Sequence, residues 1–84
     1  SKILKALKKI FPNSKIPKHF QKLKIGDLKE WDSLGNYYLI LEIEKIFKKK
    51  FSAKVFNEIK SISDIKKHLI NNWIEKNFIN FSGI

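Results

Sequence analysis

Apolar residues recur along the chain with the three- and four-residue spacing of amphipathic helices. The segment from Lys2 to Phe11 shows this pattern with lysines on the opposite side, and Pro12 ends it. The most apolar helical run begins at Ser33 and extends to about Lys49. The pattern therefore predicts two substantial helices, separated by a long connection.

Two serines mark further helix starts in the second half of the chain. Ser52 is a suitable N-cap for a short helix over 53–59. Ser61 and Asp64 match the S-x-x-[DE] capping pattern, which predicts the start of a last helix. No segment shows a convincing two-residue alternation, so no strand is expected.

The predicted helices are expected to form a single domain, residues 1–84, because no linker or internal repeat divides the chain. The fold class is all-α, a small four-helix bundle with three main helices and a short third helix. Apolar residues scattered through the connection 12–32 indicate that it is held across the core. Residues 71–84 are a C-terminal extension whose structure the pattern does not define.

The helix that begins at Ser33 is apolar on two sides. One side is the predicted core face, made of Leu39, Ile40, Ile43, Ile46 and Phe47. If the bundle forms, we expect Ile43 and Phe47 of this helix and Leu69 of the last helix to be buried, so that Phe47→Ala should cost about 3–5 kcal/mol.

The opposite side carries a second apolar strip with a lysine beside it: Leu34, Tyr37, Tyr38, Leu41 and Lys45. A helix that is apolar on both sides is either fully buried or exposes a strip to a partner, and full burial is difficult in a small domain. Tyr38 and Leu41 are the better candidates for a partner contact. The alternatives are that the long connection covers Leu34 and Tyr37, or that the tail at 78–81 covers the strip.

The composition adds a formal charge of +10, from 18 lysines without any arginine. Such a charge suits nucleic acid or lipid surfaces. However, arginine is the residue that pairs with phosphates and guanine edges, so no nucleic-acid partner is expected. The chain has no cysteine, which fits a cytoplasmic protein, and no apolar run approaches the ~20 residues of a transmembrane segment.

Few residues are arranged for catalysis or for binding a metal. His19 and His68 lack metal-ligand spacing, and no histidine close in sequence activates Ser33. An acidic cluster precedes the second predicted helix but fits no cation-binding loop: Asp27, Glu30 and Asp32. Neither an enzyme nor a metal site is therefore expected.

The sequence Trp31-Asp32-Ser33-Leu34-Gly35 opens the second predicted helix. Aspartate and serine are good N-caps, so one interpretation is a helix cap. The other is a modification site, an exposed serine where an attached phosphate would face the unpaired N–H groups of the first turn. These five residues leave both interpretations open.

Asp32-Ser33-Leu34, followed by a leucine- and isoleucine-rich helix that ends in Phe47, resembles the acyl carrier protein family. The similarity continues through the short helix after Ser52 and the capping sequence at Ser61, and it covers roughly residues 20–70. The resemblance implies that Ser33 carries 4′-phosphopantetheine, attached from coenzyme A by a phosphopantetheinyl transferase.

In this family the thiol of the arm holds an acyl or aminoacyl group as a thioester, so the expected partners are acyl- or aminoacyl-loading and transfer enzymes. The resemblance implies that Asp32 and the helix start position the hydroxyl of Ser33, that Leu34 completes the motif, and that Gly35 leaves room beside the attachment point. The exposed strip would contact the partners.

Two features depart from carriers of fatty-acid synthesis, which are usually acidic along this helix. Tyr38 and Lys45 occupy exposed positions where carboxylates are usual, and the chain extends beyond Ile70. The Trp-Asp-Ser-Leu-Gly variant is more similar to carriers of specialised or polysaccharide-linked pathways. The alternatives are an unmodified carrier-like scaffold or interaction module, and a basic module that binds nucleic acid or anionic lipid.

Overall fold

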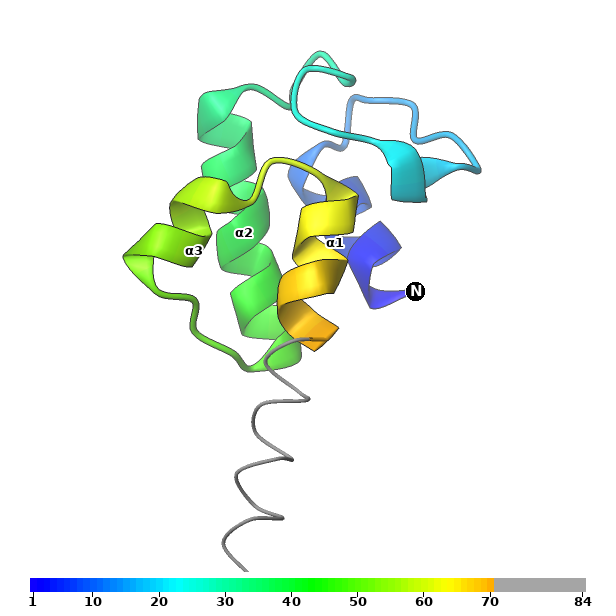
Figure 1. Cartoon of the computed structure of the whole chain (residues 1–84). Coiled ribbons are helices and arrows are strands. Elements are labelled where there is room, and N and C mark those ends of the chain that lie inside the picture. Colours follow the sequence, from blue (N-terminus) through cyan, green and yellow to red (C-terminus); the bar gives the residue numbers. More distant parts are fainter. Residues whose placement is uncertain (71–84) are drawn as a thin grey trace, which may run out of the picture.

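The computed structural model describes residues 1–70, which form four helical segments around one core (Figure 1). These segments are α1 (Lys2–Ile10), α2 (Ser33–Phe47), α3 (Ala53–Glu58) and residues 62–70. A short 3-10 helix, η1 (Phe20–Lys22), lies in the long connection. Within residues 1–70 there is no strand, only an isolated antiparallel bridge between Lys24 and Ser61. The all-α prediction is confirmed for these residues, and the extension 71–84 lies outside them.

The predicted caps form as hydrogen bonds. The hydroxyl of Ser52 accepts from the backbone N–H of Val55 at 3.2 Å, at the start of α3. The hydroxyl of Ser61 accepts from the N–H of Asp64 at 3.0 Å, while the Asp64 carboxylate accepts from the N–H of Lys60 at 3.0 Å. The bond from Asp64 satisfies a backbone donor that the first turn of a helix leaves free, and the bond from Lys60 ties the residue before the cap to the same turn.

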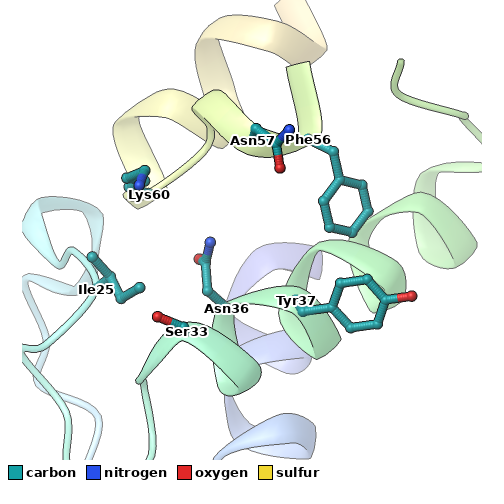
Figure 2. Close-up of a pocket in the computed structure, with 7 residues that line it drawn as sticks. All are labelled: Ile25, Ser33, Asn36, Tyr37, Phe56, Asn57 and Lys60. Carbon is teal, nitrogen blue, oxygen red and sulfur yellow. The ribbon is translucent and has the colours of Figure 1, made fainter. Parts of the chain in front are cut away.

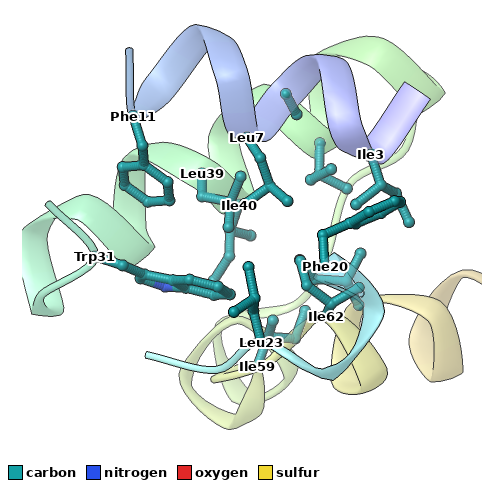
Figure 3. Packing of buried hydrophobic residues seen from close by; sticks show 13 residues of the cluster. Ile3, Leu7, Phe11, Phe20, Leu23, Trp31, Leu39, Ile40, Ile59 and Ile62 are labelled. Atoms are coloured by element: carbon teal, nitrogen blue, oxygen red, sulfur yellow. The ribbon is translucent and has the colours of Figure 1, made fainter. Parts of the chain in front are cut away.

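The helices and the connection enclose one apolar cluster, part of which is seen in Figure 3. The connection contributes Phe20, Leu23 and Trp31 to it, so the prediction that this segment is held across the core is confirmed. The Trp31 ring stacks on Phe11, with ring centroids 5.6 Å apart. The connection is thereby fixed directly before the start of α2.

A buried polar network joins the connection, α2 and the end of α3. The indole N–H of Trp31 donates to Asn36 Oδ1 at 2.9 Å, and Asn36 Nδ2 donates to the carbonyl oxygen of Ile59 at 2.8 Å. Asn36 is the one buried polar residue among those described. Because burying an amide without partners is costly, these two bonds hold the three segments in one relative position.

The expected burial of Phe47 and Leu69 is wrong in degree. Ile43 is fully buried, but Phe47 and Leu69 are only half-buried and line an open cavity of about 240 Å³ with Lys49 and Ile70. The reason is that α2 ends at Phe47, where Lys48 adopts a left-handed conformation with φ of 54° and turns the chain away. The larger truncation cost is therefore expected at Ile43.

Candidate functional site

The N-cap of α2 is Asp32. Its Oδ1 accepts a hydrogen bond from the backbone N–H of Gly35 at 2.7 Å, and its carbonyl oxygen accepts from the N–H of Asn36 at 2.8 Å. Ser33 is the first residue of the helix, after the cap. The capping function thus belongs to Asp32, and Ser33 is not needed for it.

Ser33 keeps its hydroxyl free. The residue is exposed, and no hydrogen bond of its hydroxyl is found among residues 1–70. An exposed hydroxyl on the first turn of a helix is held by a rigid backbone and remains accessible to an enzyme. The first-turn N–H groups also favour a negative group attached there.

Ser33 lies at the edge of a cavity of about 210 Å³, shown in Figure 2. The other lining residues come from the connection, from α2 and from the segment at the end of α3: Ile25, Asn36, Tyr37, Phe56, Asn57 and Lys60. The wall is braced by a hydrogen bond of 2.8 Å from the N–H of Ile25 to the carbonyl oxygen of Lys60. The cavity therefore combines a hydroxyl, an ammonium group and amides with apolar walls.

Gly35 is required by close packing inside the domain. A Cβ at this position would overlap the carbonyl oxygen of Glu30 and would lie 3.0 Å from the Phe11 ring. Because Gly35 has no side chain, the connection can pack directly against the first turn of α2. The packing reason was not visible in the sequence.

We predict that Gly35→Ala slows modification of Ser33 as well as lowering stability by about 1–3 kcal/mol, because the added methyl forces the start of α2 away from Glu30. The matched control is Gly26→Ala. Gly26 has φ of 93° and open space around its Cβ position, so its substitution strains the backbone without moving α2. Loading rates, measured where circular dichroism shows both variants folded, should fall only for Gly35→Ala. Equal rates would contradict the packing argument.

The acidic cluster before α2 separates into three independent contacts. Asp27 accepts from the backbone N–H and the ammonium of Lys24, and these bonds hold the pKa of the Asp27 carboxyl below its ordinary value. Glu30 accepts from the N–H of Asn13 and from the hydroxyl of Ser14, each at 2.9 Å. With Asp32 serving as the cap, the three carboxylates do not converge on a cation.

The apolar strip of α2 is exposed as predicted. The exposed fractions are 61% for Leu34, 48% for Tyr37, 50% for Tyr38 and 39% for Leu41, and Lys45 is also exposed. The Tyr37 ring lies against Phe56 of α3, with centroids 5.3 Å apart. The long connection therefore does not cover the strip, whereas the tail at 78–81 lies outside the described residues.

Comparisons with protein-family models, with curated proteins and with solved structures found no match. In residues 1–70, no group of three or more His, Cys, Asp or Glu side chains is placed to hold a metal ion. None of the helices in this part of the chain combines the length and apolar character needed to cross a bilayer.

The sequence indicated the residues at the start of α2 but not those that line the cavity beside them. Asp32, Ser33 and Gly35 lie together in the first turn of α2, and the strip follows on the same helix. Asn36 was missed, although it precedes Ile40 by one turn and so lies on the core face. Lys60 was missed because it comes from a distant segment, and no local pattern indicates that it lines the same cavity as Ser33.

Proposed function

We propose that this protein is a carrier of the acyl carrier protein type. It holds an acyl or aminoacyl group as a thioester on a 4′-phosphopantetheine arm attached to Ser33, in a specialised, non-fatty-acid biosynthetic pathway. The observation that supports this most directly is that Asp32 caps α2, which leaves the exposed Ser33 hydroxyl free beside a cavity.

The residues around Ser33 fit such a group. The N–H groups of Ser33 and Leu34 donate to no acceptor among the described residues, whereas those of Gly35 and Asn36 donate to Asp32. Two first-turn donors are thus available to a phosphate on Ser33, and the Lys60 ammonium on the cavity wall adds a positive charge. The apolar wall residues Ile25, Tyr37 and Phe56 suit the uncharged part of an arm.

The loading step is catalysed by a partner, the phosphopantetheinyl transferase. The Ser33 oxygen bonds to the pantetheine-bearing phosphorus of coenzyme A, and the diphosphate bond breaks. An adenosine bisphosphate leaves, and the hydroxyl proton passes to a base of the transferase. When attached, the arm supplies a thiol that carries the cargo.

The protein itself acts as a rigid support and is not an enzyme in this proposal. Trp31 and Asn36 fix the connection and the end of α3 against α2, and Asp32 fixes the first turn. The backbone position of Ser33 is thereby set before a transferase arrives, so little backbone ordering is needed on binding.

The direct test is intact-mass measurement after incubation with coenzyme A and a broad-specificity phosphopantetheinyl transferase. The expected result is a gain of one phosphopantetheine group per chain, and peptide mapping should locate it at Ser33. An unchanged mass, with a known carrier modified under the same conditions, would contradict the proposal and favour an unmodified interaction module.

We further predict that the loaded protein is a poor substrate for fatty-acid elongation enzymes. Their usual carriers present carboxylates along the corresponding helix, but here Glu42 bonds to Lys9 at 3.2 Å and Glu44 accepts from the N–H of Phe51 at 2.7 Å. The exposed positions are Tyr38 and Lys45, so contact with a basic enzyme surface should be weak or repulsive. Elongation rates should lie far below those of an acidic carrier assayed in parallel, and comparable rates would contradict the prediction.

A further inference from the structure

The exposed face of α2 changes in character along the helix axis. Its first half, next to Ser33, presents Leu34, Tyr37 and Tyr38. The last turn of α2 and the residues that follow carry four lysines: Lys45, Lys48, Lys49 and Lys50. Together with Leu41 and Glu44, these lysines line an open cavity of about 410 Å³. We call this whole surface, from Leu34 to Lys50, the α2 face.

The lysines at the end of the α2 face are only partly balanced by the carboxylates of the same helix, because four lysines and one carboxylate, Glu44, line the cavity there. Glu42 is directed to Lys9 of α1, and its side chain is only 11% exposed. Glu44 Oε2 is held by the backbone N–H of Phe51. Among residues 1–70, the recorded ion pairs involve other cations, namely Lys9, Lys24 and His68. The far end of the face therefore carries a concentrated positive charge.

We propose that the α2 face docks a protein partner whose contact surface is apolar at one end and acidic at the other. The acidic end lies against Lys45 and Lys48, and the apolar end lies against Leu34 and Tyr38. The helix rise of 1.5 Å per residue places Lys45 about 18 Å from Ser33 along α2. If Ser33 is the attachment site, as proposed above, this charge gradient sets the direction in which a partner approaches it.

The gradient favours a protein surface over an extended polyanion or a membrane. Nucleic acid presents uniform negative charge and would match a face with cations along its whole length. An anionic membrane would match a face whose cations flank the apolar strip along its whole length, whereas here the cations lie at one end. The half of the α2 face nearest Ser33 consists instead of aromatic and aliphatic side chains. Exposed tyrosines with an apolar neighbour are typical of protein contact surfaces.

The test uses the unmodified, isotope-labelled full chain and two synthetic amphipathic helical peptides. The peptides share the same apolar residues, but one ends in several glutamates and the other in several lysines. At low salt the acidic peptide should bind at least ~10-fold more tightly, and added salt should reduce this difference. Amide signals of Tyr38, Leu41 and Lys45 should shift. A spin label at the glutamate end should broaden signals near Lys48, and one at the apolar end should broaden signals near Ser33.

Three variants define the contact. Lys45→Glu should lower the preference for the acidic peptide, and Tyr38→Glu should weaken binding of both peptides. Lys5→Glu, on the exposed side of α1, makes the same charge change as Lys45→Glu away from the α2 face and should leave binding unchanged. Circular dichroism confirms that each variant is folded.

Several results would overturn the docking proposal. These are equal binding of the two peptides, reversed broadening by the labels, or binding of phosphatidylglycerol vesicles through Tyr38 and Leu41 without peptide binding. A fourth is a change in the amide signals of Tyr38 and Leu41 when Phe78 is replaced by serine and no peptide is present. That change would show that the tail, and not a protein partner, occupies the α2 face. Because the peptides bind the unmodified chain, failure here is distinguishable from failure of Ser33 to accept phosphopantetheine.

Discussion

Replacing Ser33 with alanine should abolish the mass gain from coenzyme A and transferase while leaving the fold intact. The cap of α2 is the Asp32 carboxylate, and the Ser33 hydroxyl makes no described hydrogen bond, so the substitution removes only the attachment atom. The unfolding free energy should change by less than the ~1 kcal/mol typical of losing a cap. Intact mass and thermal unfolding followed by circular dichroism measure the two effects.

Ser63→Ala is the matched control for this experiment. Ser63 is also an exposed serine in the first turn of a helix, residues 62–70, but it is not next to the cavity that Ser33 lines. Loading of this variant should equal that of the wild type. Any phosphopantetheine gain by Ser33→Ala, or its loss in Ser63→Ala, would show that Ser33 is not the attachment site.

The helices and their caps were predictable because the interactions that define them are local. Ser52 bonds to the N–H of Val55 and Ser61 to that of Asp64, three residues away in each case. Such spacings are visible in the sequence as capping patterns. The exposed strip of α2 was predictable for a similar reason, since a fixed rotation per residue assigns each side chain to a face.

The features that sequence reasoning missed depend on contacts between distant segments. Asn36 is buried because Trp31 and the Ile59 carbonyl supply its hydrogen bonds, and a helical pattern treats a lone asparagine as a surface residue. Phe47 follows the core periodicity but lies where α2 ends. The helix face predicted for Phe47 was therefore correct, but its predicted burial was too high. Lys60 reaches the Ser33 cavity only through the pairing of Ile25 with Lys60.

Replacing Trp31 with alanine should cost about 3–5 kcal/mol of unfolding free energy, a large share of the 5–15 kcal/mol typical of a domain. The Trp31 side chain is 1% exposed, stacks on Phe11, and donates the hydrogen bond that satisfies Asn36 Oδ1. Truncation removes the buried ring and leaves the Asn36 amide oxygen without this donor, so both a cavity and an unpaired polar atom result. Denaturant unfolding measures the loss.

Two comparisons separate these contributions to the Trp31→Ala effect. Trp31→Phe keeps most of the ring but removes the N–H, so it should cost about 1–3 kcal/mol through the unpaired Asn36 oxygen. Tyr38→Ala truncates an aromatic ring that is half exposed on the α2 face, and it should change stability by about 0.5 kcal/mol or less. Since Trp31 immediately precedes the cap of α2, Trp31→Phe should also slow loading of Ser33, whereas a control substitution of Val55 to alanine should not. Equal stability losses for Trp31→Ala and Tyr38→Ala would contradict the central position assigned to Trp31.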